Sequence, residues 1–511
     1  MRYFLLFFLL SSVYAVSTLP VDQVVLDLPA EVNVSYHITD SPIADVHIYG
    51  EIHNLGDKSY VLYLMKEEEG VYRRLETLGV VKPNSRVEVN ITLRITYSDE
   101  TYVPYHYLFL ATDEKEEFHG KPIDFVIDWS EYEKSVDREI LIAHNYLIPI
   151  GMLIILLVFF MLLYLSHKHR WFGEFPDEYS FKSLFFPRVR GRPIGERVAD
   201  VFMTPIVWLI EILIILVLVF YMEEKVVDTF GYDMGTRLLV FGGVVAFLLP
   251  LLYFMIAWYL DMKPLRFFTS LFLWGGVAAV ISFVINTWLS TNLTWLMFSQ
   301  TLMIAVLIAP FIEESTKGLG LCMLMGHHEF DDRVSGLVFG FTVGVGFAFV
   351  ENWFYIVSKT NPYQLGIMVW AQLILYRSFF NTLAHGIITG IGGAVIGYVK
   401  AHTNLKRFLY LSVPLSLLLV IPLHALFNIS ALMDSTRSPE LVYGLPFLYN
   451  PMFVVLLTVI FVGIYATAPP KEVREEEETE HVIRLGERML DERLFFRGDQ
   501  NVNHEPIFFK G

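Results

Sequence analysis

The sequence predicts an all-α bundle of membrane-spanning helices that carries an all-β domain at its N-terminal end. Hydrophobic residues make up 54% of the 511 residues, and the mean hydropathy is +0.48. Charged residues make up only 18%, and they gather in short segments between long apolar runs. This alternation is typical of a polytopic membrane protein. The net charge of −16 excludes a general affinity for nucleic acid, so we expect no nucleic-acid partner.

The first 15 residues predict a secretory signal peptide. Arg2 supplies a positive charge, residues 3–10 are apolar, and Val13-Tyr14-Ala15 fits a cleavage site. The apolar stretch is too short to cross a bilayer comfortably, so we expect cleavage after Ala15.

Residues 16–142 predict an extracytoplasmic β-sandwich of immunoglobulin-like size. The segments 46–52 and 86–94 alternate apolar and polar residues, and residues 53–57 have the composition of a turn. Several short strands separated by turn signals in so short a stretch favour an antiparallel sandwich. No residue pattern names a ligand, so this domain is interpreted either as a folded cap or as a module that recruits or senses substrates.

Nine apolar segments after the sandwich predict nine transmembrane helices. The first four lie within 146–289 and include a basic loop at 167–202, and the next four form a core at 295–432. Residues 469–511 are acidic and predict a solvated cytoplasmic tail. The nine segments are 146–166, 203–222, 238–260, 267–289, 295–325, 335–357, 368–399, 408–432 and 451–468.

The distribution of Lys and Arg predicts the orientation of the bundle. Basic residues are concentrated in alternate loops, above all 167–202 and 400–407, while the intervening loops contain few. Cytoplasmic loops carry such an excess of positive charge. Together with the signal peptide, this predicts a multi-pass cell-membrane protein with its N-terminus outside and its C-terminus in the cytoplasm, and the lipid bilayer as an obligatory partner.

The fifth span contains three charged residues that need a physical reason to be there. Each charge at the centre of a membrane helix costs about 2.5–3.5 kcal/mol on insertion scales. Glu313 and Lys317 are one helical turn apart, and Glu314 is also within reach of Lys317. Lys317 can neutralise one carboxylate, and the other then remains available for a proton, a water or a metal ion.

The next three spans add polar residues at a compatible depth. Residues spaced four apart lie on one face of a helix, so each of these spans presents a polar stripe. The added residues are Glu351 and Asn352 on the sixth span, Arg377, Asn381 and His385 on the seventh, and His424 and Asn428 on the eighth.

The residues themselves leave more than one interpretation open. They could form a buried network that only holds helices together, or they could be a catalytic centre, since paired carboxylates with neutral imidazoles can bind a divalent metal or deprotonate a water. The number of carboxylates exceeds what one lysine and one arginine can neutralise, which favours catalysis. The alternatives are an ion-coupled transporter or a sensor that uses the Glu/His cluster as a proton relay. The chain shows no internal repeat of the kind transporters have.

One further buried charge has no partner in the sequence. Glu211 lies in the second span. It is interpreted as a structural residue that is either protonated or paired with Arg377 or Lys317.

At the core residues the sequence resembles the PrsW family of intramembrane proteases, which is related to the CAAX-prenyl and bacteriocin-processing membrane proteases. The pattern Glu-Glu-x-x-Lys matches residues 313–317, and Phe-x-x-x-Glu ends at Glu351. A histidine span follows with Arg377 and His385, and the last motif, His-x-x-x-Asp/Asn, matches residues 424–428. The resemblance covers residues 295–432.

The resemblance implies an intramembrane endopeptidase that acts on membrane-anchored proteins. It implies Glu313 as the general base that activates water, with Glu314 and Lys317 as catalytic support. Family members are classed as metalloproteases, which implies a divalent metal, zinc being favoured, although a metal-free glutamate and histidine mechanism stays open. No small-molecule cofactor is implied.

The resemblance also implies roles for the other polar residues. Asn428 stands where the family often has aspartate, which favours a hydrogen-bonding role as an oxyanion donor. The metal ligands or water-positioning groups would be Glu351, His385 and His424, and the supporting residues Arg377, Asn381 and Asn352.

Overall fold

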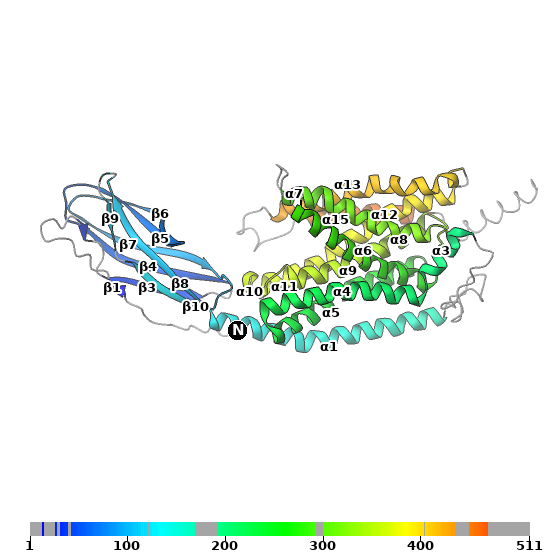
Figure 1. Ribbon diagram of the computed structural model, residues 1–511, viewed down its shortest axis with the longest axis horizontal. Coiled ribbons are helices and arrows are strands. Elements are labelled where there is room, and N and C mark those ends of the chain that lie inside the picture. Colours follow the sequence, from blue (N-terminus) through cyan, green and yellow to red (C-terminus); the bar gives the residue numbers. More distant parts are fainter. Residues whose placement is uncertain are drawn as a thin grey trace, which may run out of the picture.

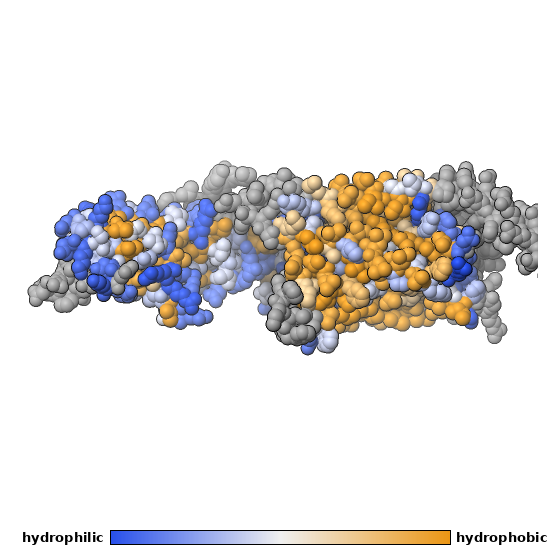
Figure 2. Space-filling view, turned by 90° about the horizontal axis from the view of Figure 1, so that it is seen from above, coloured by the Kyte–Doolittle hydropathy of each residue, from blue (hydrophilic) through white to orange (hydrophobic). Residues whose placement is uncertain are grey.

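A β-domain and a helical bundle lie end to end in the computed structural model (Figure 1). Figure 2 shows a broad apolar surface over the bundle and a mostly hydrophilic one over the β-domain. Large side chains such as Phe160 and Val217 are more than half exposed there, as expected of residues that face lipid. The structure describes residues 13–14, 26–27, 31–38, 42–113, 115, 117–120, 122–168, 193–292, 300–402, 404–435 and 449–468. The acidic tail 469–511 lies outside these residues, and so does the predicted signal peptide except for residues 13–14.

The β-domain consists of two antiparallel sheets. In the first sheet β4 pairs with β3, β2 and β7, and β1 pairs with β3; in the second the order is β10-β8-β5-β6, with β9 on β8. Buried residues of both sheets share one core, which confirms the predicted strands at 46–52 and 86–94 within β4 and β7. The strands are β1 (Val13–Tyr14), β2 (Leu26–Asp27), β3 (Glu31–Ile38), β4 (Ile43–Asn54), β5 (Tyr60–Glu68), β6 (Val71–Val81), β7 (Ser85–Thr96), β8 (Tyr102–Thr112), β9 (Glu117–His119) and β10 (Ile123–Asp128).

The boundary between the β-domain and the bundle lies earlier than the sequence predicts. Helix α1 (Ser130–Lys168) begins directly after β10, so the predicted boundary at residue 142 falls inside a helix. The first turns of α1 are rich in charge and were therefore assigned to the soluble domain. Their apolar residues Tyr132, Val136 and Ile140 recur every four residues and are buried in the core shared with the sheets.

The bundle contains eight helices, within the described ranges, that are long and apolar enough to cross a membrane. Residues 300–324 of the predicted fifth span form α7, the π-helix η1 and α8, and the three charged residues there keep this segment out of that set. The other helices are α3 (Ile194–Phe202), α4 (Pro205–Phe230), α5 (Tyr232–Leu260), α6 (Leu265–Asn292), α7 (Gln300–Met303), η1 (Ile304–Ile308), α8 (Ala309–Leu324), α9 (Arg333–Ser358), α10 (Pro362–Leu365), α11 (Ile367–Tyr376), the π-helix η2 (Arg377–Asn381), α12 (Thr382–Ala401), the 3₁₀-helix η3 (Lys406–Phe408), α13 (Leu409–Ser435) and α15 (Tyr449–Ala466).

Helices α9 and α12 are in direct backbone contact along a line of glycines. A Cβ on Gly336, Gly340 or Gly344 would lie 2.1–2.4 Å from a carbonyl oxygen of α12, so no larger residue fits at these positions. Small residues permit this kind of approach between membrane helices. The contact matters for the site because α9 carries Glu351 and α12 carries His385.

The β-domain also contacts the loop that joins α9 to α11. The carboxylate of Asp99, in the turn before β8, accepts hydrogen bonds from Asn361 at 2.9 Å and from Gln364. The Tyr132 hydroxyl of α1 donates to the carbonyl of Tyr363 at 2.7 Å, and the Tyr363 hydroxyl donates to Asp137. The connection between two site-bearing helices is therefore held by residues from the N-terminal part of the chain.

Glu211 on α4 is buried without a hydrogen-bonding partner. Its side chain is 3% exposed, and no described residue donates to either carboxylate oxygen. The pairing with Arg377 or Lys317 that the sequence left open is wrong, because both cations are bonded to other carboxylates. Glu211 therefore carries a desolvation cost that nothing described offsets.

Replacement of Glu211 by leucine should stabilise the protein. The variant removes two buried oxygens that have no described donor, so we expect a gain of about 1–3 kcal/mol in the free energy of unfolding. Thermal unfolding of the purified protein in detergent measures it. Glu224→Leu, at an exposed position on the same helix, is the control and should show no gain. A lower melting temperature for Glu211→Leu would contradict the prediction.

Candidate active site

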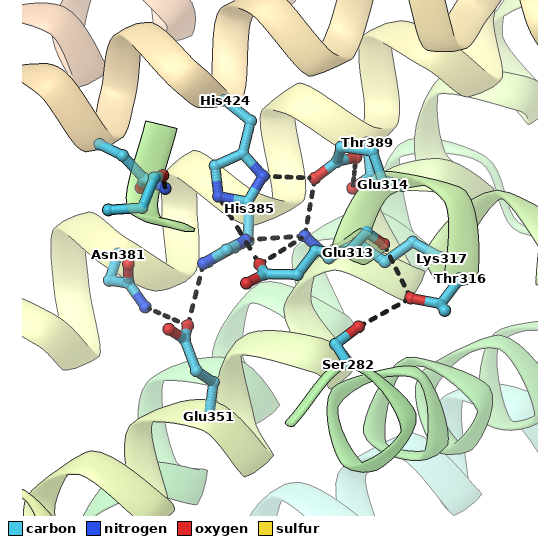
Figure 3. Close-up of polar contacts among 12 residues, drawn as sticks. Ser282, Glu313, Glu314, Thr316, Lys317, Glu351, Asn381, His385, Thr389 and His424 are labelled. Atoms are coloured by element: carbon cyan, nitrogen blue, oxygen red, sulfur yellow. Dashed lines mark hydrogen bonds and ion pairs between the residues drawn. The ribbon is translucent and has the colours of Figure 1, made fainter. Parts of the chain in front are cut away.

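The Lys317 ammonium is the centre of the polar cluster inside the bundle (Figure 3). Lys317 is fully buried on α8, and its Nζ lies 2.7 Å from Glu314 Oε1, 2.8 Å from His385 Nδ1 and 4.0 Å from Glu313 Oε2. The Phe347 ring of α9 faces the ammonium at 3.9 Å, a cation–π contact. One cation thus touches side chains from three helices.

Both carboxylate oxygens of Glu314 accept hydrogen bonds. Besides Lys317, its Oε1 accepts from His424 Nδ1 at 2.9 Å, and its Oε2 accepts from the Thr389 hydroxyl at 3.0 Å. The side chain is 1% exposed. A buried carboxylate with three donors positions its neighbours.

Glu351 is held by the whole polar stripe of the seventh predicted span. Its oxygens lie 3.1 Å from Arg377 Nη2, 2.9 Å from Asn381 Nδ2 and 2.9 Å from His385 Nε2. Three residues that the sequence placed on one helix face therefore meet one carboxylate. Asn352 connects α9 to the same segment, because its amide donates to the Arg377 carbonyl at 3.1 Å and to the Thr382 hydroxyl at 3.0 Å.

The contacts of His385 define its protonation state. Its Nδ1 faces the Lys317 ammonium, which can only donate, and its Nε2 faces Glu351, which can only accept when ionised. The imidazole is therefore neutral with its hydrogen on Nε2.

Glu313 differs from the other two carboxylates because one of its oxygens has no donor. Glu313 Oε2 is buried, and no described group hydrogen-bonds to it. The nearest imidazole nitrogen is His424 Nε2 at 3.7 Å. Since His424 Nδ1 donates to Glu314, the Nε2 of a neutral His424 is also an acceptor. Two acceptors that face each other require a proton, a water or a cation between them.

The balance of charges in the cluster also indicates that Glu313 needs a proton or a cation. Lys317 pairs with Glu314 and Arg377 pairs with Glu351, which leaves the third carboxylate, Glu313, as a surplus negative charge. In a medium of low dielectric such a charge is costly unless it is protonated or binds a cation.

The residues around Glu313 fit a divalent metal. Among the described residues Glu313, His385 and His424 each offer one ligand atom within 4.8 Å of the others. The unpaired oxygen of Glu313 and the free nitrogen of His424 are the atom types that zinc takes. Glu351, which the sequence placed among the ligands, lies beyond His385 and outside this group. His385 would exchange one of its two present contacts on binding an ion.

Asn428 does not point its amide into the cluster. Its Nδ2 donates at 2.6 Å to the carbonyl of Ala305, in η1. A π-helix leaves backbone groups outside the regular hydrogen-bond ladder, and Asn428 satisfies one of them just before α8 begins. The contact was not foreseeable from the sequence, because no local pattern marks η1. Tyr355, whose ring lies 3.8 Å from the Arg377 guanidinium, was also missed, although it follows Glu351 by one turn.

The part of the chain that resembles known proteins contains all the residues of this cluster. Residues 263–464 match the model of the PrsW family of intramembrane metalloproteases. The membrane core is PrsW-like. The chain is 29% identical to Protease PrsW of Oceanobacillus iheyensis over 102 residues, which are 20% of this chain and 41% of that protein. It is 26% identical to Protease PrsW of Clostridioides difficile over 168 residues, or 32% of this chain and 67% of that protein.

The similarity to PrsW proteins covers only part of this chain and only part of each relative. A third relative, Protease PrsW of Halalkalibacterium halodurans, is 29% identical over 26% of this chain and 55% of its own length. The chain thus spans about half the length of the curated relatives that it matches. The β-domain and the helices before residue 263 lie outside the PrsW-like segment. No solved structure shows significant similarity to the chain.

Removal of the central ammonium should destabilise the bundle. Lys317→Met leaves buried carboxylates without their cation, and removal of one partner of a buried ion pair typically costs about 3–5 kcal/mol. Unfolding in detergent measures the loss, and Glu314→Gln combined with Lys317→Met should recover part of it. Lys359→Met is the control, because Lys359 also lies over a phenylalanine ring, at 5.6 Å, but is exposed. A Lys317→Met variant as stable as the wild type would refute the central role of the ammonium.

Proposed function

We propose that the chain is an intramembrane endopeptidase that hydrolyses peptide bonds of membrane-anchored proteins. The observation that carries the proposal is the buried oxygen of Glu313, which has no described donor and faces a histidine nitrogen in a PrsW-like core. The two groups are suited to accept both hydrogens of one water molecule. Glu211 also has oxygens without a described donor, but Glu313 differs from it because its free oxygen faces a histidine nitrogen within the polar cluster.

In the proposed reaction Glu313 is the general base. A water between Glu313 and His424 loses a proton to Glu313 while its oxygen bonds to the carbonyl carbon of the substrate, and the carbonyl electron pair moves onto the carbonyl oxygen. When the intermediate collapses, the carbon–nitrogen bond breaks and the leaving amine takes the proton from Glu313. Glu314 and Lys317 hold the base and the histidines in place, as their contacts indicate.

A divalent metal fits the same site. Glu313, His385 and His424 would hold it, and when bound it would supply a Lewis acid for the water or the carbonyl. The role of Glu313 as general base belongs to the reaction without the metal. Glu351 acts as the residue that orients His385. Arg377 and Asn381 hold Glu351, and Asn352 holds the backbone of Arg377. Such supporting hydrogen bonds fix the orientation of a ligating histidine. Asn428 is assigned to positioning, through Ala305.

We also propose that the β-domain lies outside the cell and that the chain ends in the cytoplasm. The proposal rests on the basic loops at 167–202 and 400–407. Glu351 lies about two turns from the end of α9 that meets the β-domain. The substrate bond would then be cut in the outer half of the membrane.

The Glu313→Gln variant distinguishes a catalytic role of Glu313 from a structural one. It keeps the shape of the side chain but cannot accept a proton from water, so cleavage of a native substrate should fall by about 10²–10⁴-fold. Stability should change little, because Glu313 Oε2 accepts no described hydrogen bond. Quantitative proteomics of membrane-protein fragments in the native host, wild type against Glu313→Gln, provides both the substrate and the readout. A folded variant with full activity would show that Glu313 is not the general base.

The metal assignment is open to a direct measurement. Protein purified without chelator should contain about one zinc per chain by elemental analysis. His424→Ala should lose the metal, whereas His402→Ala, at an exposed position, should retain it. A metal-free wild type that still cleaves its substrate would establish the glutamate and histidine mechanism instead.

The orientation can be tested with single cysteines, because the chain contains only Cys322. In a Cys322→Ser background, a membrane-impermeant thiol reagent added to intact cells should label Ser98→Cys in the turn before β8. It should label Thr467→Cys, at the end of α15, only after permeabilisation. The reverse pattern would invert the proposed topology.

A further inference from the structure

The groups of the site form an inner and an outer layer. Glu314, Lys317, His385 and His424 have side chains that are 0–2% exposed. Glu313, Glu351 and Arg377 are 12%, 21% and 16% exposed. The partly exposed groups, Arg377 among them, are therefore the ones that a substrate can reach.

The Arg377 guanidinium has hydrogen-bond donors that no described residue uses. Its Nη2 forms an ion pair with Glu351 Oε1 at 3.1 Å, but the geometry is not that of a hydrogen bond. Both Nε and Nη2 are buried atoms for which the described residues supply no hydrogen-bond acceptor. Buried donors are nearly always satisfied in folded proteins, so unsatisfied donors at a reactive centre indicate a missing acceptor.

The guanidinium is fixed in one orientation. Its central carbon lies 3.8 Å from the centre of the Tyr355 ring, and its other side is held by Glu351. Its backbone carbonyl accepts from Asn352 at 3.1 Å, at the first residue of η2.

We propose that Arg377 binds the carbonyl oxygen of the scissile peptide bond and stabilises the negative charge that develops there. Tyr355 is a positioning residue, and its ring holds the guanidinium in place. The sequence favoured Asn428 for this task, but the Asn428 amide is bonded to Ala305. The proposal rests on the proposed peptidase function: as the carbonyl electron pair moves onto oxygen, Nε–H and Nη2–H of Arg377 become its donors. Fixed donors of this kind stabilise the transition state more than the substrate.

The test compares two Arg377 variants on one peptide. The probe is a quenched fluorescent peptide spanning the bond that the wild type cleaves and Glu313→Gln does not. Arg377→Gln should lower kcat by about 10²–10³-fold, with KM changed by less than about threefold. Arg377→Lys keeps the charge but lacks Nε–H and the planar fork, so it should lose most of the rate as well. Arg407→Gln is the matched control, since Arg407 also lies over an aromatic ring, that of Phe408 at 4.7 Å, but outside the site.

A second readout separates oxyanion binding from a structural role. A phosphinic analogue of the same peptide mimics the tetrahedral intermediate, and its affinity for Arg377→Gln should fall by the same factor as kcat. Affinity for the uncleaved peptide, measured in a Glu313→Gln background, should not change. Tyr355→Phe should behave like the wild type, and Tyr355→Leu should lose about tenfold or more in kcat.

The outcomes are distinguishable. Equal losses of affinity for peptide and analogue, or an Arg377→Gln variant within tenfold of wild-type kcat, would overturn the role of Arg377 while leaving the peptidase function intact. If Arg377→Gln does not fold, Arg377→Lys decides between the same results. A wild type that cleaves no bond that Glu313→Gln spares would remove the peptidase function itself, and with it this proposal.

Discussion

The ammonium of Lys317 is the interaction on which the rest of the membrane core depends. It lies in a medium where an isolated charge is far more costly than in water, so the surrounding groups must satisfy all of its donors. Glu314, His385 and the ring of Phe347 do so from three helices. The same cation fixes the tautomer of His385, which in turn determines which nitrogen faces Glu351. One charge thereby orders a site whose members are far apart in the chain.

The sequence allowed the identity of the site residues to be predicted, because each motif is local to one helix. Arg377, Asn381 and His385 are spaced four apart, and they meet a single carboxylate. What could not be predicted was the choice of partner between helices. Glu351 and Glu313 were equally plausible neighbours for the histidines, and only the packing of α9 against α12 separates them. The register of that packing depends on backbone contacts between glycines, which composition indicates but does not align.

The fold was predictable where the pattern is regular and less so where polar and apolar segments merge. The strands and most spans follow from alternation and apolar length. The start of α1 was missed because its first turns carry charges, although Tyr132 and Val136 recur at helical spacing. Residues 295–325 were expected to be one regular span, and η1 is a π-helix within it that no local pattern marks. Asn428 was assigned to the chemistry from the resemblance alone, and its contact with the carbonyl of Ala305, in η1, could not be predicted from the sequence.

The π-helix η2 has a consequence for how this chain tolerates change. A π turn is an α-helix that holds one extra residue. Deletion of any one of residues 377–381 would restore a regular helix with its hydrogen bonds complete and its apolar character intact. Because the π turn takes up its extra residue locally, the 20 residues of α12 would keep their rotation about the helix axis, and His385 would still face Glu351. Only the side chains that residues 377–381 present would change, so this segment can lose a residue where a regular helix could not.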